Sequence, residues 1–176
     1  MGTPSAHQPT RLILAVFSRF PEALDWARDR AVREWGPIAM ESELFRFEET
    51  DYYEASMGAG LVKQFWLFER PYDQSHTVDT KLMTNDWEEE YQRIARTGVE
   101  RPLNLDPGYM TSAKLVLSST KNFTHRIYLD RGIFAELTLY YQKNAWHPHV
   151  FTFPDYRRED YHAFFDKCRR YILDNS

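Results

Sequence analysis

Polar residues recur at alternating positions within the apolar stretch NFTHRIYLDRGIFAELTLYY, residues 122–141. If residues 130–132 form a three-residue hairpin loop, with Gly132 in the left-handed conformation, Arg126 lies directly opposite Glu136. Opposed residues share one face of a sheet, so the hairpin is predicted to have a mixed polar face and an apolar face. The first holds Arg126, Tyr128, Phe134, Glu136, Thr138 and Tyr140, and the second holds His125, Ile127, Leu129, Ile133, Ala135, Leu137 and Leu139.

This hairpin has an alternative turn and two alternative roles. A two-residue turn at Arg131-Gly132 would pair Ile127 with Glu136 and mix the two patterns, so the cleaner segregation favours the three-residue loop. An arginine opposite a glutamate is often an ordinary cross-strand ion pair that contributes about 0.2–1 kcal/mol and supports the fold. The other possibility is that the pair belongs to a binding site.

Two further motifs favour the binding site. DPGY (residues 106–109) and FPDYR (residues 153–157) each join a carboxylate, a proline and a tyrosine, which suits rigid loops that present polar groups. With the hairpin, they predict a pocket for a small anionic ligand, a nucleotide or a phosphorylated metabolite. The residues expected to hold the ligand are Lys114, Lys121, His125, Arg126, Arg157, Tyr109, Tyr128 and Tyr156. The residues expected to transfer protons, and to be catalytic if the protein is an enzyme, are Glu136 and Asp106.

The histidines of the HPH stretch raise the question of a metal site. His147 and His149 would face the same side of an extended segment and could bind a metal with Asp155 or Glu136. Two histidines are too few for a site, and the sequence lacks H-E-x-x-H or another metal-binding spacing. We therefore expect surface histidines and no metal.

Sequence motifs for nucleotide hydrolysis and for serine catalysis are absent. The chain contains neither G-x-x-x-x-G-K-[ST] nor G-x-G-x-x-G, so no phosphate-binding loop is predicted. In TKNF (residues 120–123), Phe123 replaces the carboxylate of the guanine-reading element of GTPases. G-x-S-x-G is also missing. These observations argue against a GTPase and a serine hydrolase, and the sequence implies no particular cofactor.

Composition limits the class of protein. Of the 176 residues, 43% are hydrophobic and 16% aromatic, which is enough apolar material to form a packed core. The formal net charge of −4 makes nucleic-acid binding unlikely. Cys168 is the only cysteine, which excludes an intramolecular disulfide and favours a cytoplasmic location. No apolar run reaches the roughly 18 residues that span a membrane. We expect residues 1–10 to be a flexible tail and residues 11–176 to form one domain.

The first half of the chain predicts a ferredoxin-like arrangement within an α+β fold. RLILAVFS (residues 11–18) indicates a buried central strand, and a helix is expected between Pro21 and the Gly36-Pro37 stop. Residues 38–49 and 61–69 indicate neighbouring antiparallel strands, and Thr84 suggests a cap for a second helix. This order is the opening of a βαββαβ unit.

The second half predicts a longer antiparallel sheet and a closing helix. Residues 103–122 fit an extended segment with a turn at Pro107-Gly108, or a short helix capped at Thr111, and we favour the extended form. The long hairpin follows. The chain then ends in a helix with one apolar face, on which Cys168 is a small core residue. That face comprises Tyr161, Phe164, Phe165, Cys168 and Ile172.

Three stretches resemble a known family. They are ESELFRFEETDYYEASMG, RPLNLDPGYMTSAKLVLSSTKNFTHRIYLDRGIFAELTLYY and FTFPDYRREDYHAFF, which in this order resemble an uncharacterised bacterial family, the domain of unknown function number 4416. The resemblance covers nearly all of the chain from Arg11 and implies no catalytic residue. The positions that match the family's motifs are Asp51, Tyr52, Tyr53, Gly58, Asp106, Pro107, Gly108, Tyr109, Lys114, Thr120, Lys121, His125, Arg126, Tyr128, Glu136, Pro154, Asp155, Tyr156 and Arg157.

A function from another class is also compatible with the sequence. Exposed aromatic residues, among them Tyr52, Tyr53 and Trp146, would let a non-enzymatic module dock a protein partner. A small-molecule pocket and a docking module are therefore the two functions predicted.

Overall fold

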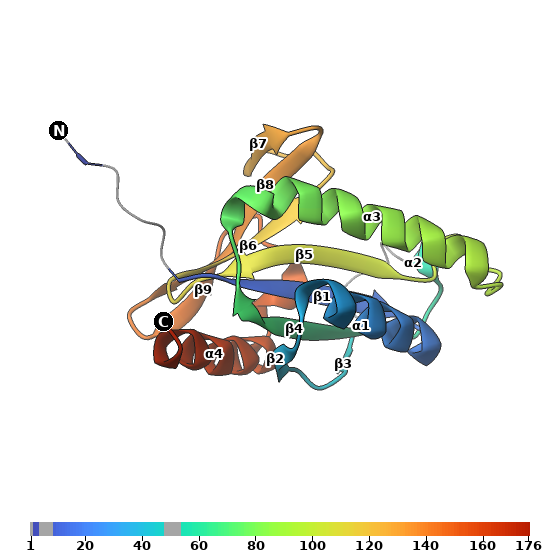
Figure 1. Ribbon diagram of the computed structural model, residues 1–176, viewed down its shortest axis with the longest axis horizontal. Helices are drawn as coiled ribbons and strands as arrows, with labels where there is room; N and C mark the ends of the chain where they lie inside the picture. The colour runs from blue at the N-terminus through green and yellow to red at the C-terminus, as the bar shows by residue number, and fades with distance from the viewer. Residues whose placement is uncertain (1, 4–8, 48–53) are drawn as a thin grey trace.

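The computed structural model describes residues 2–3, 9–47 and 54–176 and contains one nine-stranded antiparallel sheet (Figure 1). The strands follow the order β2-β4-β1-β5-β6-β8-β7, with β3 beside β4 and β9 beside β8. They are β1 (Arg11–Ser18), β2 (Ile38–Glu41), β3 (Phe45–Arg46), β4 (Val62–Pro71), β5 (Asn104–Met110), β6 (Lys114–Ser119), β7 (Arg126–Asp130), β8 (Ile133–Gln142) and β9 (Ala145–Pro148). The helices are α1 (Pro21–Trp35), α2 (Glu54–Met57), α3 (Thr77–Ile94) and α4 (Glu159–Asp174), with 3-10 turns η2 (Gln74–His76) and η3 (Pro154–Arg157).

The first half has the predicted ferredoxin-like topology. The order β2-β4-β1-β5 places the first and third strands of the unit at the centre, with the second and fourth strands outside. All eight residues of β1 are buried because it lies between β4 and β5. α1 and α3 pack on the sheet face that carries Leu12, Leu14 and Val16. The prediction of an α+β fold with a largely antiparallel sheet is confirmed.

The local signals explain α1 but place the start of α3 wrongly. α1 begins at Pro21, buries Ala27 and Ala31, and ends before Gly36, whose φ of 87° favours glycine. α3 begins at Thr77, not at Thr84 as predicted. Thr84 is buried within the helix, where its hydroxyl donates to the carbonyl oxygen of Lys81 at 2.9 Å. The Thr84 hydroxyl therefore makes its hydrogen bond within the helix and does not cap its N-terminus.

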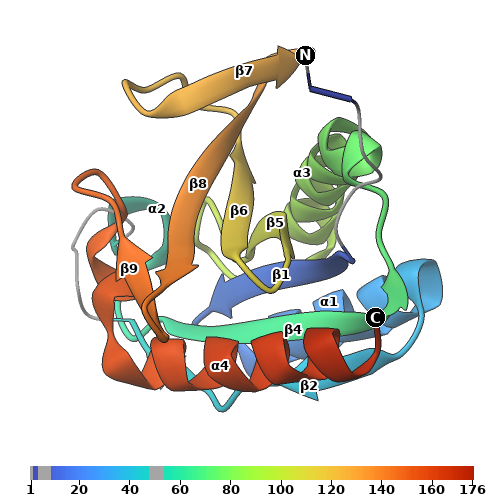
Figure 2. The ribbon, with the colours of Figure 1, turned by 90° about the vertical axis from the view of Figure 1, so that its left-hand side faces the viewer.

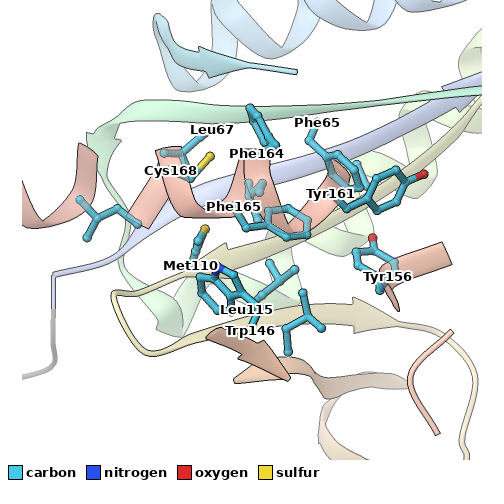
Figure 3. Packing of buried hydrophobic residues seen from close by; sticks show 14 of the residues in the cluster. Phe65, Leu67, Met110, Leu115, Trp146, Tyr156, Tyr161, Phe164, Phe165 and Cys168 are labelled. Atoms are coloured by element: carbon cyan, nitrogen blue, oxygen red, sulfur yellow. The ribbon is translucent and has the colours of Figure 1, made fainter. Parts of the chain in front are cut away.

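The opposite face of the sheet is covered by α4, which runs beside β4 (Figure 2). The five predicted core residues of α4 are all buried. Figure 3 shows the rings of Tyr161, Phe164 and Phe165 packed among side chains of β4 and β5. Phe65 contacts Tyr161 edge to face at a centroid distance of 4.8 Å, and Phe165 at 5.1 Å. Cys168 is fully buried, as predicted for a small core side chain, and burial raises the pKa of its thiol. No helix of the described residues is both long and apolar enough to cross a membrane.

The sheet opens between β5 and β6. Strand pairing between β5 and β6 is limited to residues 108–110 of β5, and just before them the Ser118 hydroxyl donates to the Pro107 carbonyl oxygen at 2.6 Å. Gly108 lies where the two strands converge, because a Cβ there would be 2.1 Å from the carbonyl oxygen of Val116. The predicted turn at Pro107-Gly108 is therefore wrong, since both residues lie within β5. The chain reverses instead after Thr111, whose hydroxyl oxygen accepts the backbone N–H of Lys114.

The β7–β8 hairpin projects beyond the rest of the sheet (Figure 1). Arg126 and Glu136 are direct partners, as predicted. The turn itself is the two-residue alternative: Arg131 and Gly132 both have positive φ, and Asp130 pairs with Ile133. The three-residue loop is therefore wrong, and an irregularity between residues 128 and 130 restores the predicted register further along β7.

Along the middle of β8, the buried face of the hairpin is the polar one. Glu136 is 7% exposed and Thr138 is fully buried, whereas Ile127 on the apolar face is 71% exposed. Leu139 turns into the core only after a second register shift between β6 and β8. The hairpin therefore directs Arg126 and Glu136 toward the interior of the molecule, while Asp130 and Arg131 at its tip are exposed.

Candidate functional site

A cavity of about 880 Å³ lies beside the opening between β5 and β6. Its walls come from α3, from the unpaired part of β5, from the β6–β7 connection, from the polar face of the hairpin and from residues 151–156. Six of the predicted site residues line it: Asp106, Lys121, His125, Arg126, Glu136 and Tyr156. The other four, Tyr109, Lys114, Tyr128 and Arg157, do not.

Three of the four residues that do not line the cavity lie away from it because of their positions on the strands. Lys114 lies at the far end of β6, opposite Tyr140. Tyr109 pairs with Val116 on the sheet face that α3 covers, not on the face of the cavity. Tyr128 is exposed on the projecting hairpin. The predicted anion-binding set is therefore smaller than the sequence indicated.

The FPDYR motif forms a buried turn. Pro154 to Arg157 make the 3-10 turn η3 that leads into α4, and Asp155 and Tyr156 are buried within it. Arg157 donates from Nη2 to the carbonyl oxygen of His149 at 2.7 Å and so braces the preceding loop. The motif is thus a structured turn in which Asp155 and Tyr156 are buried, and Tyr156 lines the cavity.

Three residues of the hairpin region form a polar cluster on one wall. Arg126 Nε donates to Glu136 Oε2 at 2.9 Å, and His125 Nε2 lies 3.2 Å from the same oxygen. Arg126 Nη1 donates to the carbonyl oxygen of Lys121 at 3.1 Å. Its Nη2 makes no hydrogen bond to any of the described residues. The guanidinium is thus held on two sides and retains N–H groups for a ligand.

Aromatic rings form the rim of the cavity next to this cluster. The imidazole of His125 stacks on Phe151 with a centroid distance of 5.3 Å and an interplanar angle of 14°. Phe123 meets both rings nearly edge-on, at 81° to His125 and 80° to Phe151. Phe123 is 56% exposed and Phe151 is 47% exposed, although both are large apolar side chains.

Asp106 lies on the opposite wall, in contact with α3. Lys81 Nζ donates to the Leu105 carbonyl oxygen at 2.8 Å and to Asp106 Oδ1 at 3.3 Å. Asn104 donates to the other oxygen of Asp106 at 2.9 Å. Burial alone would raise the pKa of Asp106, but Lys81, Lys63 and Arg101 outweigh it and lower this pKa. Asp106 is consequently an ionised carboxylate.

Glu88 of α3 lies on the same wall with the opposite shift. Burial raises the pKa of Glu88 despite the nearby charges of Lys81 and Arg101. Its Oε1 accepts the backbone N–H of Leu105 at 2.7 Å, and its Oε2 accepts Arg101 at 3.1 Å. Two carboxyl groups with pKa values shifted in opposite directions are a feature of sites that handle protons.

A buried lysine closes the inner end of the cavity. Lys63 is 3% exposed, and its Nζ lies 2.6 Å from Asp155 Oδ2 and 4.5 Å from the centroid of the Tyr156 ring. Burial, together with the charges of Asp155, Asp106 and Glu136, raises the pKa of Tyr156 well above its usual value. The Tyr156 hydroxyl is therefore a neutral phenol, and it has no hydrogen-bond partner among the described residues.

Sequence reasoning missed five charged residues of this cavity: Lys63, Lys81, Glu88, Glu89 and Arg101. Two signals were present. Lys63 precedes Phe65 by two residues in β4 and so shares its buried face. Lys81 and Glu88 continue the helical spacing of Thr84 in α3. No comparable pattern marked Arg101, which lies in the connection between α3 and β5.

The HPH histidines and the predicted docking aromatics lie away from the cavity. His147 and His149 flank the ring of Tyr140, at centroid distances of 5.3 and 5.1 Å. In the described part of the chain, no three His, Cys, Asp or Glu side chains gather in a metal-binding group. Trp146 is buried because it packs on Tyr141, so its predicted exposure is wrong. The other two docking residues, Tyr52 and Tyr53, lie outside the described residues.

The fold and the cavity together define an α+β protein in which a ferredoxin-like half is extended by further antiparallel strands, with charged side chains concentrated where the sheet opens. The chain belongs to the family described as Domain of unknown function (DUF4416), which matches residues 8–171. The resemblance drawn from the sequence motifs is thus confirmed. No similarity to a curated protein or to a solved structure was found.

Proposed function

We propose that the cavity beside the β5–β6 opening binds a small anionic ligand, a nucleotide or a phosphorylated metabolite. The observation that carries this proposal is the guanidinium of Arg126, which Glu136 and the Lys121 carbonyl oxygen hold in place while Nη2 keeps free N–H donors. A fixed guanidinium suits a phosphate because its planar donors match two oxygens at once. The side chain of Lys121 and the imidazole of His125, which line the same wall, would complete the anion site.

If a reaction occurs in the cavity, the carboxylates of Glu136 and Asp106 would accept or stabilise protons there. Glu136 contacts His125 and Arg126, so it would balance positive charge around a bound anion. Asp106 lies on the α3 wall and is ionised, which makes it the candidate proton acceptor. Tyr156, kept neutral by burial, is a candidate hydrogen-bond donor.

The proposal is tested by isothermal titration calorimetry with inorganic phosphate, ribose 5-phosphate and AMP. The informative variant is Arg126→Lys, which keeps the positive charge beside Glu136 but removes the planar pair of donors. Arg28→Lys is the matched control, because Arg28 makes a comparable 3.0 Å contact with Glu41 far from the cavity. We expect saturable binding to the wild type and to the control, and at least tenfold weaker binding to Arg126→Lys.

Two results would overturn the proposal. One is that none of the three compounds binds the wild type at millimolar concentration. The other is that a compound binds with the same affinity to Arg126→Lys as to the wild type. Thermal unfolding of each variant, recorded without ligand, shows whether the variant is folded, so that loss of structure is not mistaken for loss of binding.

A further inference from the structure

The rim of the cavity restricts the chemical class of the ligand. Phe123 and Phe151 line the cavity and remain about half exposed, next to charged side chains that are themselves paired. Large exposed apolar side chains beside a pocket are a common mark of a binding surface. An anion site alone does not explain why these two apolar rings are exposed at the cavity.

The geometry of the rings favours a planar partner. His125 covers one face of the Phe151 ring in a nearly parallel stack, at 14° and 5.3 Å, and Phe151 still keeps 47% of its surface exposed. Phe123 lies at 80° to Phe151, so the two phenyl rings do not stack in parallel on each other. Parallel stacking is the arrangement in which protein aromatic side chains bind nucleobases.

The ring platform and the anion site are adjacent in the structure. His125, which stacks on Phe151, and Arg126, which would hold the anion, are neighbours in the chain, and both contact Glu136 Oε2. A ligand that uses both must carry a planar ring and an anionic group on one short framework. The cavity of about 880 Å³ falls within the range of small-molecule sites and accommodates such a ligand.

We propose that the ligand is a nucleotide whose base stacks on Phe151, within the aromatic rim formed by Phe123, His125 and Phe151, while its phosphate binds Arg126. This inference rests on the proposed function and narrows it, because a sugar phosphate without a ring would leave the rim uncovered. The base contributes stacking without a requirement for one particular base, since every base offers a π face.

The test compares ligands that differ only in the base. Ribose 5-phosphate, AMP, GMP, CMP and UMP are titrated into the wild-type protein, into Phe151→Leu and into Phe151→Tyr. We expect each purine nucleotide to bind the wild type at least tenfold more tightly than ribose 5-phosphate. Phe151→Leu should remove this advantage and leave the affinity for ribose 5-phosphate unchanged. Phe151→Tyr is the matched control, because it keeps the ring, and it should behave like the wild type.

Failure of the inference and failure of the proposed function give different results. If ribose 5-phosphate binds as tightly as AMP and Phe151→Leu changes neither affinity, the nucleotide inference is overturned and the anion site stands. If none of the phosphates binds, both are overturned. If a single-stranded oligonucleotide binds but no mononucleotide does, the small-ligand inference is also overturned. Because Phe151 is exposed, its variants should fold like the wild type. Circular dichroism of each variant checks this.

Discussion

Arg126 Nε donates to Glu136 Oε2 at 2.9 Å directly across the β7–β8 pair, and the two side chains are mostly buried. A carboxylate withdrawn from water needs a compensating charge, and Arg126 supplies it, while His125 Nε2 lies 3.2 Å from the same oxygen. The pair thus links the stability of the hairpin to the electrostatics of the cavity.

Replacing each member of this pair, alone and together, should give a non-additive result. Arg126→Ala leaves Glu136 buried without its main partner and should lower the free energy of unfolding by about 1–3 kcal/mol. Adding Glu136→Gln removes that uncompensated charge, so the double variant should recover roughly 1 kcal/mol relative to the sum of the single changes. Urea unfolding of the four proteins measures the coupling. Strict additivity would show that the pair does not support the fold.

The buried pair of Lys63 and Asp155 should be far more sensitive than an ion pair on the surface. Lys63→Met leaves Asp155 without its 2.6 Å partner in a fully buried position, which should cost about 3–5 kcal/mol. Arg28→Ala breaks the exposed contact with Glu41 and should cost less than about 1 kcal/mol. Chemical denaturation of both variants gives the comparison, and equal losses would contradict this account.

Asp106 should make stability depend on pH in the acid range. Its pKa in the folded protein is lowered, so its contribution is present above the unfolded pKa of about 3.9 and disappears as pH falls through the folded value. Asp106→Asn should therefore be less stable than the wild type at pH 7 by about 1–3 kcal/mol. The difference should shrink as pH approaches about 2. Asp86→Asn, at an exposed position of α3, is the control and should change the free energy of unfolding little at pH 7. A difference that stays constant with pH would refute the assignment.

Gly108 should tolerate no side chain. A Cβ at this position would lie 2.1 Å from the Val116 carbonyl oxygen, so Gly108→Ala forces β5 and β6 apart where their pairing begins. Gly98→Ala is a useful comparison, because Gly98 has a positive φ but open space around it, and its cost should be only about 1–2 kcal/mol. Thermal unfolding should show a clearly larger loss for Gly108→Ala, and similar melting temperatures would argue against close packing of the strands as its cause.

Elements with strong local signals could be predicted from the sequence. Pro21 and Gly36 bound α1, apolar spacing places the buried face of α4, and the alternation in β7 and β8 sets Arg126 opposite Glu136. The failures occur where tertiary contacts override local preference. Pro107-Gly108 has the composition of a turn, yet β1 holds it as strand by pairing on one side.

Only part of the site could be predicted from the sequence, again because tertiary contacts place the rest. Its hairpin residues follow from register, which is a local property. Lys63, Lys81 and Glu88 reach the cavity through the tertiary positions of β4 and α3, and their charges are compatible with burial only through partners distant in the sequence. Conversely, Lys114 has the right chemistry for an anion but lies at the wrong end of β6.

The position of α4 has a consequence for synthesis of the protein. Ile13, Phe65 and Leu67 face a layer contributed by residues that leave the ribosome much later, in β9, η3 and α4. Until that layer exists, the nascent chain exposes an apolar sheet surface to solvent. Exposed surfaces of this kind promote aggregation. Ribosome stalling just before Glu159 should thus yield a chain that needs a chaperone, even though most of the sheet has already been made.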